Sequence, residues 1–180
     1  MRKELVWQEN KLSFYLFKPD IFHLYDKEKP GKEEPVHRYR ITHIIHQYIY
    51  LIFGGYRIFY CVKDNDVVSY VIYSRCNRHI FNSGNKKDYY VIFYYTYPEY
   101  RGHGYSSVLM KTLFRYIKDN NDFYETIVYN NQASIRAAEK IGFKQDGFVN
   151  RSKFLHTLTR TSNSQNLLFK CVRSGRHNIE

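Results

Sequence analysis

Cysteines and long apolar runs are scarce in this chain of 180 residues. The three cysteines, Cys61, Cys76 and Cys171, are widely separated and form no CxxC pair, so the sequence predicts neither a disulfide framework nor a zinc site. The longest apolar run, residues 49–56, is far too short to cross a bilayer. Since no segment resembles a signal peptide, we expect a cytoplasmic protein with no membrane-inserted part.

Blocks of like charge are also missing, although the chain is strongly basic. The formal net charge is +11, yet lysine and arginine are scattered, and no run of five or six marks a nucleic-acid-binding tail. A basic surface suits nucleic acid, anionic lipid or a polyanionic small molecule. We therefore expect no nucleic-acid partner, and either a solvated basic surface or a polyphosphate ligand.

The composition is otherwise that of a globular protein. Hydrophobic residues make up 43% and charged residues 25%, which at this length predicts one domain spanning residues 1–180. Aromatic residues reach 18%, an unusually high fraction. They would suit a platform that stacks a sugar or a nucleobase, or simply a core rich in aromatic rings.

Apolar periodicity predicts alternating strands and helices along the chain. Strands are expected at residues 12–18, in a hairpin over 57–75, and at 88–97, 124–130, 152–160 and 166–172. Helices are expected from Val36 to Ile52, after the turn at 97–104, and at 131–143. The strand at 88–97 is apolar enough to be covered on both faces. The buried stripe of the middle helix would comprise Val108, Leu109, Leu113 and Ile117. This order predicts an α/β or α+β architecture with a mixed sheet.

The turn before the middle helix points to a ligand. Residues 97–107 contain a proline, two glycines and two serines directly between a strand and a helix. A helix N-terminus carries unpaired backbone N–H groups and a positive potential, and so binds phosphate where side chains leave room. Gly102 and Gly104 would give that room, and Ser106 and Ser107 would add hydroxyl donors. A diphosphate is the ligand that fits.

Two motifs resemble those of the GNAT superfamily of N-acetyltransferases. Residues 101–106, Arg-Gly-His-Gly-Tyr-Ser, look like the loop that binds the acyl-CoA pyrophosphate, and residues 96–100 match the segment preceding it. Residues 131–134, Asn-Gln-Ala-Ser, and 139–143, Glu-Lys-Ile-Gly-Phe, match the helix beside the pantetheine arm. The resemblance implies an acetyl-CoA-binding core at about residues 88–148. It also implies a fold with a mixed sheet of about six to seven strands and about four helices. The motif style is closest to the ribosomal-protein N-terminal acetyltransferases and their relatives.

The resemblance also implies an acetyl-CoA site and no metal. Backbone groups at the end of the strand expected over 88–97 would bind the pantetheine, and the turn at 101–106 would bind the pyrophosphate. Asn131 would begin the helix beside the pantetheine arm. These cofactor-binding residues are Tyr94, Tyr95, Thr96, Arg101, Gly102, His103, Gly104, Tyr105, Ser106 and Asn131. Two positions depart from the family pattern: Ser106 replaces a glycine or alanine, and Ala138 replaces a tyrosine that acts as the general acid in many members. Ser134 is then the candidate acid, unless it is only a helix-start residue.

The general base is not evident from the residues. Some relatives carry an acid where this chain has Thr126, and the adjacent Glu125 would point to the opposite face of a regular strand. Other candidates are a water chain through backbone carbonyls or the side chains of Asp88, Glu99, and His43 with His46. As a metal pair, His43 and His46 lack third and fourth ligands. His103 would lie over the phosphates, where a positive charge helps.

The resulting hypothesis is an acetyl-CoA-dependent N-acetyltransferase. Its acceptor would be a primary amine of a small molecule or peptide, and the basic charge fits a nucleotide-linked amino sugar better than a polyamine or aminoglycoside. The alternative, motivated by Ala138, is a non-catalytic acyl-CoA-binding regulator of the same fold. A nucleic-acid-binding module rests on charge alone. Both a monomer and a homodimer are compatible with the sequence.

Overall fold

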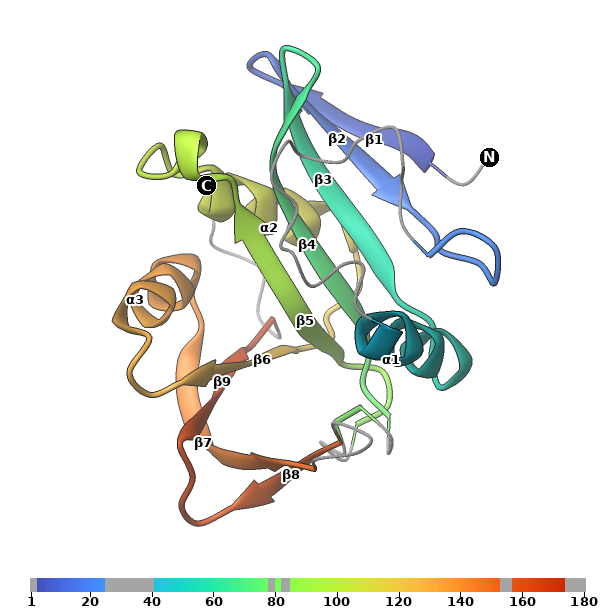
Figure 1. The fold of residues 1–180 in the computed structure, drawn as a ribbon. Coiled ribbons are helices and arrows are strands. Elements are labelled where there is room, and N and C mark those ends of the chain that lie inside the picture. The colour runs from blue at the N-terminus through green and yellow to red at the C-terminus, as the bar shows by residue number, and fades with distance from the viewer. Residues whose placement is uncertain (1–2, 25–40, 78–79, 82–84, 153–156, 174–180) are drawn as a thin grey trace. The chain divides into compact units, whose positions relative to one another are not determined.

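The computed structural model describes residues 3–24, 41–77, 80–81, 85–152 and 157–173 (Figure 1). These residues belong to two compact units. Unit 1 comprises the chain up to Tyr73 together with Phe93–Ile117, and unit 2 comprises Ser74–Ile92 and the chain after Ile117. The chain passes between the units three times: within β4 (Asp66–Arg75), within β5 (Tyr89–Thr96) and after Ile117.

Unit 1 contains four antiparallel strands in the order β1-β2-β3-β4 (Figure 1). They include β1 (Lys3–Glu9), β2 (Leu12–Phe17) and β3 (Arg57–Lys63). The turn between β3 and β4 consists of Asp64 and Asn65, whose φ angles are 48° and 71°. Because aspartate and asparagine tolerate this left-handed backbone, they close a tight hairpin. The hairpin predicted over 57–75 is confirmed.

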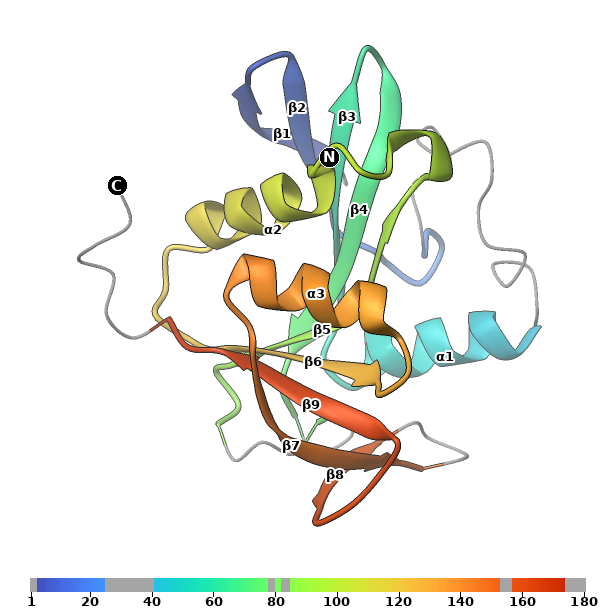
Figure 2. The same ribbon diagram turned by 90° about the vertical axis from the view of Figure 1, so that its left-hand side faces the viewer.

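Two α-helices, α1 (Ile41–Ile52) and α2 (Tyr105–Tyr116), lie on opposite faces of the unit 1 strands (Figures 1 and 2). The expected start of α1 near Val36 lies outside the described residues. Its apolar stripe is not fully covered, since the side chain of Ile52 is 72% exposed. None of the described helices is long and apolar enough to span a membrane.

Helix α2 packs against the sheet of unit 1 through the stripe centred on Leu109 and Leu113, both fully buried. The ring of Tyr116 stacks on that of Phe59 in β3, with the centroids 5.8 Å apart. The prediction that Val108 is buried was wrong, because this side chain is 39% exposed. Met110, on the other side of the stripe, is buried instead, and so is Thr112, one turn after Val108.

Unit 2 contains a parallel pair, β5 with β6 (Phe123–Val128). The other neighbours pair antiparallel: β9 (Asn166–Cys171) pairs with both β6 and β7 (Lys144–Arg151), and β8 (Leu158–Thr161) pairs with β7. The last strand in the sequence therefore lies between two earlier ones. The parallel and antiparallel pairs together confirm a mixed sheet and the α+β class.

Helix α3 (Gln132–Ile141) belongs to unit 2, and both of its ends match the sequence prediction. The side chain of Asn131 accepts a hydrogen bond from the backbone N–H of Ser134 at 3.1 Å, which caps the first turn. Gly142 follows the last turn with a φ angle of 108°, the left-handed conformation that ends many helices at glycine. Local capping signals thus set the length of α3.

The element count differs from the expectation of six to seven strands and four helices. Within the described residues there are nine strands, three α-helices and one short 3₁₀ turn. Strand β1 escaped prediction because a bulge after Leu5 breaks its alternation, and β7 because a bulge before Gly147 does the same. The single domain over residues 1–180 stays a prediction.

Strand β5 is covered unevenly along its length. Tyr89, Tyr90 and Val91 at its beginning are buried, as expected for a strand covered on both faces. The half in unit 1 is more open, and the side chain of Phe93 is 41% exposed. The prediction of full cover over 88–97 was therefore wrong for the second half of the strand.

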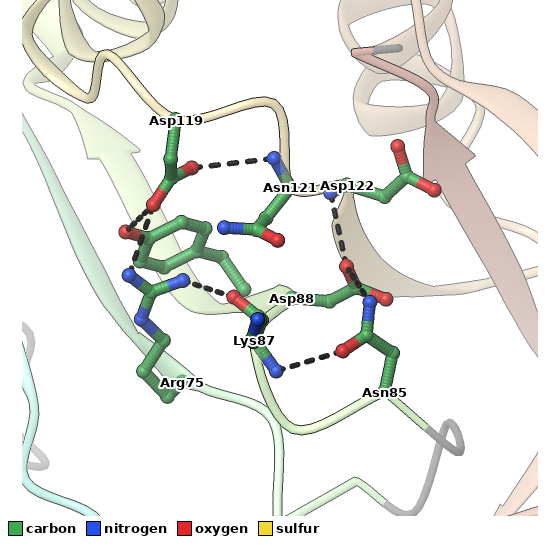
Figure 3. Close-up of polar contacts among 8 residues, drawn as sticks. Arg75, Asn85, Lys87, Asp88, Asp119, Asn121 and Asp122 are labelled. Carbon is green, nitrogen blue, oxygen red and sulfur yellow. Dashed lines mark hydrogen bonds and ion pairs between the residues drawn. The ribbon is translucent and has the colours of Figure 1, made fainter.

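A polar cluster anchors the beginning of β5 (Figure 3). The carboxylate of Asp119 accepts hydrogen bonds from the hydroxyl of Tyr89 at 2.8 Å and from Nη2 of Arg75 at 2.9 Å. The guanidinium of Arg75 also lies 3.9 Å from the centre of the Tyr89 ring and donates to the carbonyl of Lys87. Burial alone would raise the pKa of Asp119, but hydrogen bonds from Tyr89, Asn121 and Arg75 together lower it.

One acidic side chain of β6 is buried without compensation. Glu125 is only 4% exposed, and its Oε1 has no hydrogen-bond partner among the described residues. Burial raises the pKa of this carboxyl from 4.5 to about 8, because the charged form is poorly solvated there. Glu125 is therefore neutral in the folded protein at pH 7.

We expect Glu125→Gln to stabilise the protein at alkaline pH. The pKa of the Glu125 carboxyl is higher in the folded protein than in the unfolded chain. The free energy of unfolding is therefore highest below pH 4.5 and falls as the pH rises from 4.5 toward 8. The loss is about 1.4 kcal/mol per pH unit within that window. A neutral glutamine removes this dependence, which denaturant titrations at pH 5 and pH 8 will measure. Glu139→Gln, at an exposed position of α3, is the control. Parallel pH profiles for wild type and Glu125→Gln would show that the carboxyl ionises normally.

Candidate functional site

The end of β5 leads into a short turn that opens α2, all within unit 1. The 3₁₀ turn Pro98–Tyr100 is closed by hydrogen bonds from Tyr100 N to Tyr97 O at 2.9 Å and from Arg101 N to Pro98 O at 3.2 Å. Gly102 and Gly104 both have φ angles of 79°, which side chains disfavour. A Cβ atom at either position would meet nothing within 4 Å. The glycines therefore leave open space in front of the turn.

Helix α2 begins at this turn without a side-chain cap. Gly104 is the N-cap residue, and its carbonyl accepts the hydrogen bond from Val108 N at 3.1 Å. The N–H groups of Tyr105, Ser106 and Ser107 precede the first intrahelical donor, so the helix offers them no acceptor. The first turn of α2 contains no acidic residue, so nothing there offsets the positive end of the helix dipole. The turn has the chemistry of an anion site.

The side chains of the turn fold back onto its own backbone. Arg101 Nε donates to the carbonyl of Thr96 at 3.1 Å, and its guanidinium carbon lies 5.5 Å from the centre of the Tyr95 ring. His103 Nδ1 lies 2.9 Å from the carbonyl of Arg101 and must donate to it, so this nitrogen carries a proton. The imidazole also stacks on the ring of Tyr105 at 6.0 Å. Both residues thus hold the shape of the turn.

The last residues of β5 are fixed by β4. The hydroxyl of Ser69 donates to the carbonyl of Tyr95 at 2.8 Å and lies 3.0 Å from the hydroxyl of Thr96. Tyr97 N also donates to the carbonyl of Val68 at 3.2 Å. Sequence reasoning missed Ser69, because only the pairing of β4 with β5 brings it there.

The sequence-predicted site residues divide between the two units. Tyr94, Tyr95, Thr96 and the loop residues 101–106 are brought together in unit 1. Asn131 and Ser134 lie in unit 2, at the start of α3. Within unit 2, the Asn131 side chain is used as the helix cap, and Ala138 is fully buried in the middle of α3.

The candidate bases have different environments. Asp88 is buried, and its Oδ1 accepts from Asp122 N and from Asn85 Nδ2, both at 3.1 Å (Figure 3). One carboxylate oxygen of this candidate base is therefore already occupied by two donors. Burial raises the pKa of its carboxyl. Thr126 is half-buried, and Glu99 is an exposed residue of the 3₁₀ turn.

Histidines were the remaining candidates for a base. The side chains of His43 and His46 lie outside those that the structure describes, so their roles stay predictions. Across the described part of the chain, no group of three or more histidine, cysteine, aspartate or glutamate side chains could hold a metal ion.

Comparison with known proteins gives one family. A model of the Acetyltransferase (GNAT) family matches residues 18–143. No curated protein matches the sequence significantly.

Solved structures of acetyltransferases resemble the fold at low sequence identity. The ribosomal-protein-S18-alanine N-acetyltransferase from Escherichia coli is 13% identical with a TM-score of 0.53, over 93% of this chain and 99% of that one. A GNAT-family acetyltransferase from Streptococcus agalactiae 2603 is 12% identical with a TM-score of 0.51, over 66% of each chain. Nourseothricin acetyltransferase is 20% identical with a TM-score of 0.48, over 66% of this chain. The match spans 65% of the nourseothricin enzyme's length.

Proposed function

This chain belongs to the acetyltransferase (GNAT) family, and on that premise we propose that it transfers an acetyl group from acetyl-CoA to a primary amine. The observation that carries the proposal is the turn at Gly102 and Gly104. It joins open space, unpaired N–H groups and a helix N-terminus at one place, which is what a diphosphate needs. The pyrophosphate of acetyl-CoA would bind there, and the end of β5 would hold the pantetheine.

Acetyl-CoA supplies a thioester that is already activated toward an amine. The amine nitrogen bonds to the carbonyl carbon, the C–S bond breaks, the amine loses a proton and the thiolate gains one. An alkylamine of pKa about 10.4 is neutral in only roughly one molecule in 2,500 at pH 7, so loss of the proton needs help. Backbone groups of Tyr94–Thr96, held by Ser69 and Arg101, would orient the thioester.

The acceptor would be a small molecule or a peptide. A net charge of +11 favours an acceptor with an anionic part, such as a nucleotide-linked amino sugar, over a polyamine. One observation favours a second function. Ala138 is fully buried at the position where many family members carry the tyrosine that acts as the general acid. The loss of that tyrosine suits a regulator that binds acyl-CoA without turning it over.

Free-thiol release from acetyl-CoA across a panel of amines tests the proposal. The panel would contain nucleotide-linked amino sugars, free amino sugars, peptides, aminoglycosides and polyamines. Turnover with one class supports the enzyme and identifies its acceptor chemistry. Calorimetric binding of acetyl-CoA with no turnover across the panel supports the regulator, and absence of binding contradicts both.

We expect Gly104→Val to abolish acetyl-CoA binding, because a branched side chain would fill the space in front of the turn. Gly55→Val is the matched control. Gly55 follows α1 with a φ angle of 67° and also has nothing within 4 Å of its missing Cβ. Both variants carry similar backbone strain, on the order of 1 kcal/mol. Calorimetry should show binding by Gly55→Val and none by Gly104→Val. Equal affinity in the two would contradict the phosphate loop.

We expect Ser134→Ala to lower kcat by about a hundredfold if its hydroxyl protonates the departing thiolate. Affinity for acetyl-CoA should stay nearly unchanged, because the capping bond uses the backbone N–H of Ser134 and not its hydroxyl. Ser134→Thr, which keeps a hydroxyl, should retain much of the rate in steady-state kinetics. Should kcat remain at the wild-type level in Ser134→Ala, the serine only begins the helix.

A further inference from the structure

A strip of aromatic rings lies along the end of β5 and the adjoining part of β4. The rings of Phe93 and Tyr95 are nearly parallel, with an angle of 12° and centroids 6.2 Å apart. The ring of Tyr70 is tilted by 45° to each of them, at 6.0 Å from both. The buried Tyr97 closes the strip, edge-on to Tyr95 at 5.2 Å. We call this surface, formed by two nearly parallel rings with a tilted one beside them, the aromatic shelf.

The shelf lies on the face of the sheet that α2 does not cover. Helix α2 packs on Phe59, and Phe59 shares its face with Cys61 and therefore with Ser69, its partner across the β3–β4 pair. Ser69 contacts the Thr96 hydroxyl, which places Thr96 on the α2 face as well. Neighbouring side chains in a strand alternate, so Tyr70 and Tyr95 point to the opposite face.

This arrangement gives the end of β5 two different sides. The turn at the start of α2 is continuous with the α2 side, where the pyrophosphate and the pantetheine of acetyl-CoA would lie. A second substrate can reach the same stretch of backbone from the opposite face, the one on which α1 lies. On that face the side chain of Phe93 is 41% exposed.

The positive charge of Arg101 beside the aromatic rings restricts which ligands can bind to them. The guanidinium of Arg101 lies 5.5 Å from the centre of the Tyr95 ring. A second compact cation on these rings would be repelled by it, which disfavours a polyamine. Aromatic faces instead suit a flat ring, either an aromatic ring or the C–H face of a sugar.

We propose that Tyr70, Phe93 and Tyr95 form the acceptor subsite and select primary amines attached close to a flat ring. The inference rests on the proposed acetyl transfer and adds a substrate class to it. Ring-bearing amines, whether aryl amines or amino sugars, should have lower KM values than open-chain amines of similar size. Phe93 determines specificity through the face of its ring.

Steady-state kinetics with three acceptors tests this subsite: tyramine, glucosamine and an open-chain amino alcohol. Phe93→Leu keeps apolar bulk but removes the ring face, and Phe93→Tyr restores it. Trp7→Ala, at a β1 aromatic that is 39% exposed, is the matched control in the same unit. We expect Phe93→Leu to raise KM for the preferred ring-bearing amine about three- to tenfold. Phe93→Tyr and Trp7→Ala should not, and KM for acetyl-CoA should stay constant in all three.

The outcomes separate the subsite from the activity itself. If Phe93→Leu raises KM for tyramine alone, the subsite selects an aromatic ring. If it raises KM for glucosamine alone, the subsite selects a sugar ring. Equal KM values for ring-bearing and open-chain amines, or no change in Phe93→Leu, would overturn the subsite while leaving acetyl transfer intact. Where no amine is turned over, line broadening of the tyramine or glucosamine proton resonances on adding protein reports binding directly. Broadening that is seen with wild type and lost in Phe93→Leu supports the subsite. Broadening in both wild type and Phe93→Leu, or in neither, refutes the subsite.

Discussion

The left-handed backbone of Gly102 and Gly104 is the constraint on which the site depends. It lets the chain leave β5, turn within a few residues and begin α2 with its N–H groups directed at open space. The bond from Arg101 to the Thr96 carbonyl then ties the turn back to the strand. A Cβ atom at either glycine would meet nothing within 4 Å, so the backbone donors at the start of α2 have open space beside them. Any larger residue would change both the path of the chain and the space available to a ligand.

The second half of β5 serves two faces at once. One face, with Thr96, is braced by Ser69 and covered on the same side by α2, while the other presents the rings of Phe93 and Tyr95. Such a division suits a reaction that joins two substrates, because each can reach the same backbone from its own side. This half of the strand is only partly buried, and its sequence, Phe-Tyr-Tyr-Thr, is less apolar than the Tyr-Tyr-Val-Ile of the first half.

Sequence signals that act locally were sufficient for much of the fold. The hairpin at Asp64 and Asn65, the glycine turn before α2 and both ends of α3 follow from residues a few positions apart. What the sequence could not reveal depends on pairing between distant segments. Ser69 reaches β5 only through strand pairing, Asp88 is occupied by Asp122 from another part of the chain, and bulges hide the alternation of β1 and β7. The exposure of Val108 likewise depends on how α2 is rotated against the sheet.

The position of β9 has a consequence for how the protein is made. Strands β6 and β7 each pair with β9, which follows both of them in the sequence. Because the chain is synthesised from its N-terminus, β6, α3 and β7 leave the ribosome before β9, the strand that pairs with both β6 and β7, has been made. These segments must therefore wait as nascent chain with open edges, whereas all the residues of unit 1 have already been translated by Ile117. Assembly of unit 2 is accordingly one of the last events of translation, and the interval before it is when the chain has most need of a chaperone.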